Sequence, residues 1–246
     1  EDDLAGGPVT GSGTFTIQAG DGVASLTVGG QAGISGGTFT PVSFTTPLGN
    51  TLSITAYNPA TGELSYSYTL NAAENHPAGA SENSLFEDFP VVLTDTDGDA
   101  TGGILSANIV DDVPTANADP AQTVAEDAVG IIGGNVLVND LEGADGASLT
   151  SVTIGGTITA IGPVETTVVP RANGTYTFTA SGDWTFDPTP GVANAAGVDA
   201  SFSYTITDGD GDTSSAQQPI TLTRGPRPMA GAPVTLVVND GNLTDG

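Results

Sequence analysis

Asp95-Thr96-Asp97-Gly98-Asp99 and Asp208-Gly209-Asp210-Gly211-Asp212 are the two stretches from which the fold of this chain can be predicted. Each follows a run of β-branched and aromatic residues, at 91–94 and 202–207, and precedes another such run, at 104–110 and 220–223. Two strand-like runs joined by a turn that contains Asp-Gly predict a β-hairpin. The sequence therefore predicts antiparallel strands joined by two strongly acidic turns.

The two acidic turns mark an internal repeat, because Asp208 lies 113 positions after Asp95. The same interval relates Glu126-Asp127 to Asn239-Asp240, and Glu1-Asp2 is the corresponding pair at the head of the first unit. Each unit contains some seven strand-like runs in roughly 110 residues, as a β-sandwich does. We therefore predict an all-β fold of two tandem β-sandwich domains, 1–112 and 113–224. A linker and the first strand of a third repeat are expected at 225–246.

The apolar residues occur in short runs of Val, Ile, Leu, Phe and Tyr, which are separated by Gly, Pro, Asn and Asp. Many short strands with such turn residues between them are typical of all-β proteins. The expected strands are 13–18, 23–28, 38–44, 51–57, 64–70, 89–94 and 104–110 in the first unit, and 122–125, 134–138, 148–154, 166–170, 174–180, 183–187, 202–207 and 219–223 in the second.

The chain is strongly acidic: its 246 residues include 29 Asp and Glu but only 3 Lys and Arg, for a net charge of −26. Such a field repels nucleic acids and anionic membranes, so we exclude both as partners. No apolar run is long enough to cross a membrane as a helix, and we expect no membrane insertion. The chain contains no cysteine, so disulfides cannot stabilise it. Because it opens on Glu1 without a signal sequence, we expect it to be a segment of a longer protein.

Three carboxylates within five residues are more than a turn needs. Two like charges about 4 Å apart repel each other by roughly 4 kcal/mol near a protein surface. Carboxylate oxygens without a thiolate or imidazole nearby favour Ca²⁺ over zinc. The pattern is not an EF-hand, because its sixth residues are Ala100 and Thr213 and its twelfth residues are Ser106 and Pro219. The alternative is that the acidic hairpins are simply well-solvated turns.

Both acidic turns should lie where the chain enters their units, because the last strand of such a sandwich leaves by the opposite end. The second turn would then meet the acids around the linker, and the first would meet the acids that begin the chain. The candidate calcium ligands are Asp111, Asp112, Asp119, Glu126, Asp127, Asp208, Asp210 and Asp212 at the junction, and Glu1, Asp2, Asp95, Asp97 and Asp99 at the head of the first unit. The linker at 223–228 carries two arginines and no acid, so we expect less calcium there or none.

The chain offers little for catalysis, since it has one histidine, His76, and neither cysteine nor lysine. We expect His76 in a surface loop rather than in a Ser/His/Asp arrangement. Glu82 and Glu87-Asp88 could form a glycosidase pair, but solvated loop acids or additional calcium ligands are the favoured interpretation. Trp184 is expected in core or cross-strand packing rather than in a sugar-binding platform. We therefore predict that the protein is not an enzyme.

The chain resembles the repeated extender modules of giant bacterial surface adhesins that type I secretion exports, the repeats-in-toxin adhesins with bacterial cadherin-like and VCBS-type repeats. The stretches that carry the resemblance are 54–62, 64–70, 93–99 and 108–114 in the first unit, and 126–127, 134–140, 182–188 and 202–208 in the second. The resemblance implies Ig-like, cadherin-like sandwiches in tandem, calcium at or near their junctions, and a mechanical role on the cell surface.

We accordingly predict a secreted, structural extender of a bacterial cell-surface adhesin, stiffened by calcium at its junctions and projecting a distal binding domain for adhesion and biofilm formation. Its expected partners are the neighbouring repeats of the same chain, with ligands contacted by other domains, and the segment itself is expected to be monomeric. The alternative is an adhesive module that binds a glycan or a protein, for which exposed aromatic residues beside a calcium loop would be the evidence.

Overall fold

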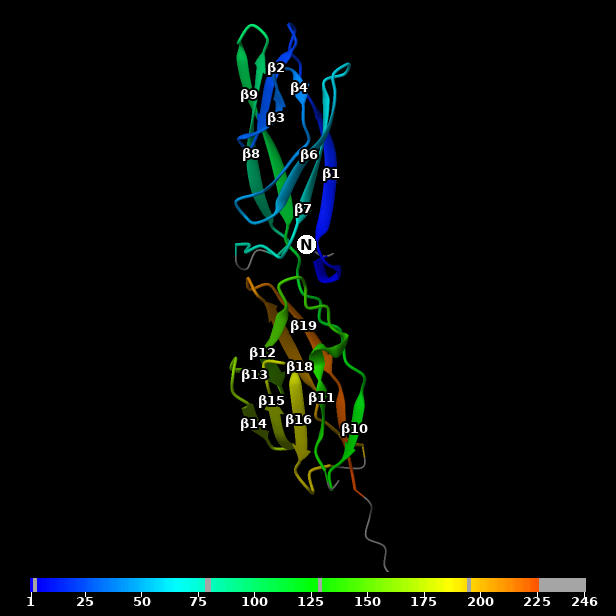
Figure 1. Cartoon of the computed structure of the whole chain (residues 1–246). Helices are drawn as coiled ribbons and strands as arrows, with labels where there is room; N and C mark the ends of the chain where they lie inside the picture. The colour runs from blue at the N-terminus through cyan, green and yellow to red at the C-terminus, as the bar shows by residue number, and fades with distance from the viewer. Residues whose placement is uncertain (2–3, 78–80, 128–129, 194–195, 226–246) are drawn as a thin grey trace, which may run out of the picture.

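A computed structural model shows an elongated, all-β molecule in which two units lie end to end (Figure 1). It describes residues 1, 4–77, 81–127, 130–193 and 196–225. Two short 3₁₀ turns, η1 (Leu4–Gly6) and η2 (Val136–Asn139), are the helical elements among these residues. None of the described helices is long and apolar enough to cross a membrane. The strand expected for a third repeat lies outside the described residues.

The first unit is a sandwich of two antiparallel sheets. One sheet has the order β1-β7-β6-β5 and is formed by β1 (Val9–Thr16), β5 (Val42–Thr45), β6 (Thr51–Asn58) and β7 (Glu63–Leu70). The other has the order β4-β3-β2-β8-β9 and is formed by β2 (Val23–Val28), β3 (Gln31–Ser35), β4 (Thr38–Phe39), β8 (Ser84–Asp95) and β9 (Ala100–Val110). β1 and β9 are therefore edge strands.

The second unit has three sheets. The first two have the orders β11-β16-β15-β14 and β13-β12-β18-β19. They contain β11 (Ile132–Asn135), β12 (Ala147–Ile154), β13 (Thr157–Ala160), β14 (Thr167–Arg171), β15 (Gly174–Phe178), β16 (Asp183–Pro188), β18 (Phe202–Asp208) and β19 (Thr213–Gln218). The third has the order β10-β20-β17, with β10 (Gln122–Ala125), β17 (Val198–Asp199) and β20 (Ile220–Thr223).

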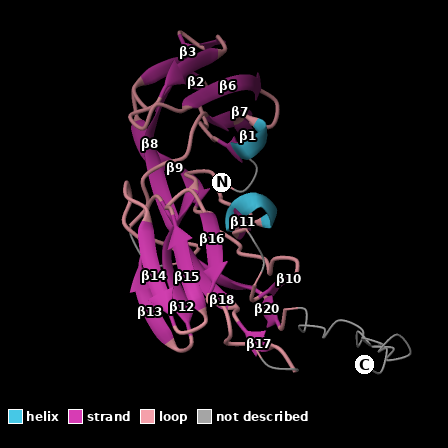
Figure 2. Cartoon of the chain, turned by 90° about the horizontal axis from the view of Figure 1, so that it is seen from below, coloured by secondary structure: helices cyan, strands magenta, loops and turns pink. Residues whose placement is uncertain are grey.

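One strand pair is parallel: β10 runs in the same direction as β20, with Gln122 opposite Ile220 and Ala125 opposite Thr223. The two strands lie beside each other in Figure 2. The other strand pairs of the described residues are antiparallel. As a result the chain enters the second unit near the first and travels along β10 to the far end.

Each unit has its own apolar core, built from residues that alternate along the strands, as the period of two in a strand requires. The first core contains Ile17, Leu26, Val28, Ile34, Leu52, Ile54, Leu64, Phe89 and Leu93. The second is richer in aromatic rings and contains Val124, Val136, Leu149, Val152, Ile154, Ile161, Val169, Tyr176, Phe178, Trp184, Phe186, Ala200, Phe202, Tyr204, Ile206, Ile220 and Leu222. The all-β prediction is confirmed, whereas the domain limits after 112 and 224 stay predictions.

Four expectations about single elements are wrong. The strand expected at 38–44 is instead two strands, β4 and β5, which belong to different sheets. The run at 134–138 does not continue as a strand, because the Asn135 side chain accepts a hydrogen bond from the Leu137 N–H and starts η2. The second acidic turn leads into β19, a polar edge strand, and not directly into the run at 220–223. His76 is buried, with 4% of its surface exposed, although a surface loop was expected.

Trp184 lies in the second core, as expected, with 2% of its surface exposed and its ring edge-on to Phe202 at 5.3 Å between centroids. We predict that Trp184→Ala lowers the free energy of unfolding by about 3–5 kcal/mol, because it leaves a large cavity. Denaturant unfolding followed by circular dichroism measures the loss. Val164→Ala is the control, since Val164 is 93% exposed and should change stability by less than about 0.5 kcal/mol. Equal effects of the two substitutions would contradict the assigned core.

Candidate metal centre at the junction

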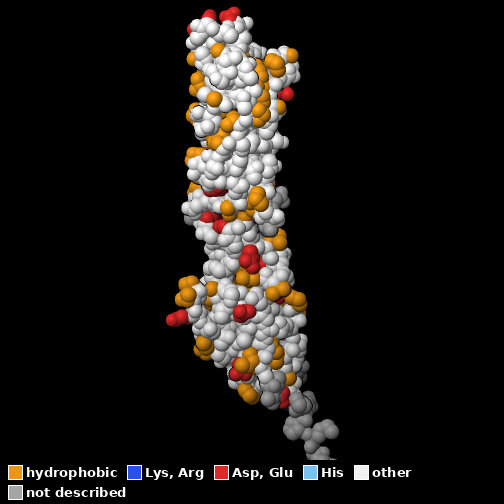
Figure 3. Space-filling view, viewed as in Figure 1, with side chains coloured by type: hydrophobic (Ala, Val, Ile, Leu, Met, Phe, Trp, Pro, Cys, Tyr) orange, Lys and Arg blue, Asp and Glu red, His pale blue; other side chains and the backbone are white. Residues whose placement is uncertain are grey.

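Six aspartates gather where the two units meet. Asp111 and Asp112 lie in the linker directly after β9, Asp145 lies in the loop before β12, and Asp208, Asp210 and Asp212 belong to the β18–β19 turn. The turn points at the first unit, and acidic side chains are visible around the middle of the molecule (Figures 1 and 3). We call this set of six residues the junction cluster.

The β18–β19 turn is held by its first aspartate. The Oδ1 atom of Asp208 accepts hydrogen bonds from the backbone N–H groups of Gly211, at 2.9 Å, and Asp212, at 2.6 Å. Gly211 has a φ of 109°, a conformation that a residue with a side chain rarely adopts. The turn therefore folds around one carboxylate oxygen and presents the remaining carboxylates side by side.

The cluster contains two overlapping groups of three. Carboxylate oxygens of Asp145, Asp208 and Asp210 lie within 4.8 Å of one another, and so do those of Asp111, Asp210 and Asp212. Asp210 belongs to both groups. The loop before β12 is tied to the turn because Asp145 Oδ2 accepts a hydrogen bond of 3.1 Å from the Asp210 N–H.

Residues of both units contribute to this arrangement. Asp212 Oδ1 accepts a hydrogen bond of 3.0 Å from the backbone N–H of Ser81, which precedes β8 in the first unit. Asn83 of the same loop donates from Nδ2 to Asp111 Oδ2 at 2.9 Å. Asp112 Oδ2 accepts from the Ala144 N–H at 2.6 Å. The cluster is therefore shared between the first unit, the linker and the second unit.

Several oxygens of the cluster are buried without a hydrogen-bond partner among the described residues. They are both carboxylate oxygens of Asp210 and one oxygen each of Asp112, Asp208 and Asp212. Burying an unpaired carboxylate costs several kcal/mol unless a cation or a donor compensates it. A set of oxygen donors of this kind, with no sulfur or nitrogen among them, fits the coordination that Ca²⁺ prefers.

Burial also changes the protonation of the cluster in the absence of metal. It raises the pKa of Asp111 to about 6; the His76 charge opposes this rise and the Asp210 charge adds to it. Burial likewise raises the pKa of Asp208 to about 6, against two backbone hydrogen bonds that lower it. The pKa of Asp145 is raised by burial and then by Asp112 and Asp210. Bound cations would reverse these shifts by favouring the ionised form.

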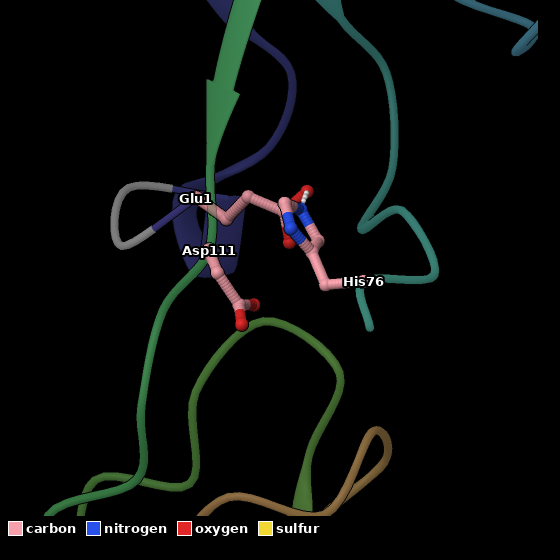
Figure 4. Close-up of side chains that lie close together, drawn as sticks. All are labelled: Glu1, His76 and Asp111. Carbon is pink, nitrogen blue, oxygen red and sulfur yellow. Dashed lines mark hydrogen bonds and ion pairs between the residues drawn. The ribbon is translucent and has the colours of Figure 1, made fainter. Parts of the chain in front are cut away.

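A mixed group of Glu1, His76 and Asp111 lies against the first unit's side of the cluster (Figure 4). The imidazole Nδ1 is 2.9 Å from Asn83 Oδ1, and Nε2 is 3.3 Å from Glu1 Oε1. Because Asn83 uses its Nδ2 atom as a donor to Asp111, its Oδ1 atom accepts from Nδ1. Burial lowers the pKa of His76, but Asn83, Asp111 and Glu1 together raise it above its ordinary value.

The first acidic turn lies at the opposite tip of the first unit, at the top of Figure 1. Asp95 and Asp97 form a group of three there with Asp21. Asp99 pairs its backbone with that of Asp95 but is not part of this group. The expectation that Glu1 joins this turn is wrong: β1 begins beside the end of β7, so Glu1 lies at the junction end. Asp2 lies outside the described residues.

Three acids expected at the junction are also placed elsewhere. Glu126 and Asp127 lie at the far end of the second unit, because β10 runs parallel to β20 and away from the junction. Glu126 Oε2 accepts a hydrogen bond of 2.6 Å from the Ala193 N–H there. Asp119 lies beside β19, where burial and Asp140 raise the pKa of its carboxyl to about 6.

Asp145 and Asp21 are the ligand candidates that the sequence interpretation missed. Each precedes a glycine and then a strand whose first residue pairs with the start of the acidic turn: Val23 with Asp95, and Ala147 with Asp208. The signal was available as an Asp-Gly pair ahead of β2 in the first unit and ahead of β12 in the second. The two tips are therefore built alike, and the second also receives the linker acids.

Comparison with known protein families finds a match to slightly less than half of the chain. Residues 111–224 match the profile of the bacterial cadherin-like domain. No curated protein matches the chain.

Two solved structures are similar to the chain at low identity. One is the Bacteroides ovatus mixed-linkage glucan utilization locus protein SGBP-B in complex with a mixed-linkage heptasaccharide (17% identity, TM-score 0.20, 95% of this chain and 46% of that chain). The other is from a study of host cell surface retention of a 1.5-MDa bacterial ice-binding adhesin (18% identity, TM-score 0.27, 91% of this chain and 59% of that chain). The chain thus spans roughly half the length of either structure.

The raised pKa values predict how pH affects the metal-free protein. Asp111 and Asp208 have pKa values of about 6 in the folded state, compared with about 3.9 for an unfolded aspartate. Their contribution to stability is present below pH 4 and is lost as the pH rises through 6. The melting temperature of calcium-stripped protein should therefore rise by a few degrees when the pH is lowered from 7 to 5. Protonation of His76, whose pKa is also raised, adds to this rise.

Differential scanning calorimetry on protein stripped with a chelating resin measures this shift. With millimolar calcium the dependence should invert, because acid then displaces the bound ion. Asp111→Asn should reduce the shift of the stripped protein, whereas Asp88→Asn, on an exposed part of β8, should preserve it. A melting temperature that falls from pH 7 to pH 5 without calcium would contradict the prediction.

Proposed function

We propose that the chain is a structural segment of a bacterial cell-surface adhesin in which calcium, bound between the units, fixes their relative orientation. The match of residues 111–224 to the bacterial cadherin-like domain supports an adhesin-type module. The end-to-end arrangement of the two units supports an extending role, because length is gained with every unit (Figure 1).

The observation that carries this proposal is the buried, unpartnered carboxylate of Asp210 in the second unit, which lies close to the carboxylate of Asp111 in the linker from the first unit. Without a cation, the carboxylates of the cluster repel each other and the contact between the units is weakened. With calcium bound in the two groups, the same carboxylates are attracted to the ions, so the linker, the turn and the loop before β12 are held together.

The overlap of the two groups suggests separate tasks for two sites. Asp145, Asp208 and Asp210 all belong to the second unit, so an ion there would stiffen its tip. Asp111 comes from the linker and shares Asp210 and Asp212 with the turn, so an ion there would fix the linker. Asp210 couples the two sites. The tip formed by Asp21, Asp95 and Asp97 would hold calcium more weakly, because its side chains are more exposed.

Calcium dependence also suits a chain that is exported before it folds. Extracellular modules bind calcium with dissociation constants of about 10⁻⁴–10⁻³ M, so such sites are empty in the cytosol and filled outside. At 100 times the dissociation constant each site adds about 2.7 kcal/mol to stability. With a net charge of −26, the metal-free chain would resist compaction. We propose a secreted, non-enzymatic protein of the bacterial surface, exported by type I secretion, that supports adhesion and biofilm formation.

Asp210→Asn should remove most of the calcium-dependent stiffening, since it weakens both groups at once. Calcium titration with small-angle X-ray scattering should show a longer and better-defined particle for the wild type in millimolar calcium than in chelator. For Asp210→Asn we expect this difference to fall by at least half, and the calcium-dependent rise in melting temperature to shrink with it.

Asp97→Asn is the matched control, because Asp97 occupies the same place in the first acidic turn, 113 positions earlier. It should remove calcium from the distal tip and leave the orientation of the units unchanged. If the wild type has the same scattering and the same melting temperature in chelator and in calcium, the proposed function is wrong.

A further inference from the structure

The first unit has an open groove along one side, between the edge strand β1 of one sheet and the edge strand β9 of the other. The part nearer the junction has a volume of about 400 Å³. Its walls are inward-facing core residues: Leu52, Tyr66, Tyr68, Phe89, Leu105 and Ile109. Tyr66, Tyr68 and Leu105 are only partly buried, although they pack against the core. The groove thus exposes part of the hydrophobic core.

In the second unit a strand occupies the position that corresponds to this groove. Its sheet β11-β16-β15-β14 has the same order as β1-β7-β6-β5, so β11 corresponds to β1. The interval of 113 residues places 105–110, the second half of β9, on 218–223, which includes β20. In the second unit this stretch is covered by β10, which pairs with β20 along its length. β9 has β8 as its one strand partner among the described residues.

Burial differs accordingly. Val124 of β10 is 5% exposed and belongs to the second core, and the β20 residues beside it, Ile220 and Leu222, are 1% and 0% exposed. By the same interval Leu105 and Ala107 of β9 correspond to Gln218 and Ile220 but remain partly exposed, whereas Ile109, the counterpart of Leu222, is 4% exposed. The groove of the first unit therefore lies at the position that the strand β10 fills in the second unit.

Glu1 shows where the missing strand connects. Its Oε1 atom accepts a hydrogen bond of 3.0 Å from the Glu74 N–H, in the loop after β7. Glu126 accepts one of 2.6 Å from the Ala193 N–H, in the loop after β16, which is the counterpart of β7. Glu126 directly follows β10. A strand in the β10 position of the first unit would therefore lead directly into Glu1.

We infer that the groove between β1 and β9 is the seat of one further strand, which runs parallel to the second half of β9 and leads into Glu1. The strand is a short extended segment with an apolar side chain at the position of Val124, inserted between Tyr68 and Ile109. This inference rests on packing and topology, and it does not depend on calcium.

The test is to place the chain's own counterpart in front of it. Residues 113–125 are appended before Glu1, so that Glu1 follows the copied Ala125 as Glu126 does. We expect the amide protons of 105–110 to exchange at least 10-fold more slowly, and the melting temperature of the first unit to rise by about 5 °C or more, in chelator as well as in calcium. Hydrogen exchange followed by mass spectrometry and calorimetry measure the two effects.

The control is the same extension with Val124→Asp in the appended copy, which keeps its length and removes its apolar side chain. This variant should lose most of both effects. If the two extensions behave alike, or if neither changes the exchange of 105–110, the inference is overturned. A dimer could also overturn the inference, because a second copy would then cover the groove. This would be the result if the chain without the extension dimerises in sedimentation experiments, if its amide protons of 105–110 are already protected from exchange, and if the extension does not dissociate the dimer.

Discussion

The junction depends on one electrostatic constraint: carboxylates are buried between the units, and several of their oxygens have no hydrogen-bond partner among the described residues. Asp210 is the extreme case, because both of its oxygens are buried and unpartnered. Its turn is already held by Asp208, so the remaining acids are not needed to fold the hairpin. A stable arrangement of this kind requires either protons or cations, and at neutral pH cations are the available choice.

The sequence was sufficient for most of the longer strands and for the repeated turns, since alternation, Asp-Gly turns and a fixed interval are local signals, but it did not reveal β3, β13, β17 or β19. It was not sufficient for the ends of the units. The placement of Glu126 depended on the direction of β10, and a short apolar run does not reveal whether it will pair parallel or antiparallel. Once β10 pairs parallel to β20, Glu126 must lie far from the junction. The same error displaced Glu1.

The missed ligands show a second limit. Asp145 lies 63 positions before Asp208 in the sequence and reaches the turn only because β12 pairs with β18. A single Asp-Gly pair is too common to indicate a metal site, and its meaning came from the equivalent Asp21 beside the first turn. His76 was misplaced for a related reason: its burial results from Glu1 and Asn83, which approach it from different segments.

The parallel pairing of β10 and β20 has a consequence for a protein under tension. The chain enters the second unit at the junction end of β10 and leaves it at the far end of β20, and the two strands lie side by side. A pull on the two ends drives these strands in opposite directions along their length. Their hydrogen bonds are then strained together rather than opened one after another, and Val124 must leave the core at the same time. A parallel strand in the groove of the first unit would give that unit the same resistance, which connects the inferred strand with the proposed extending role.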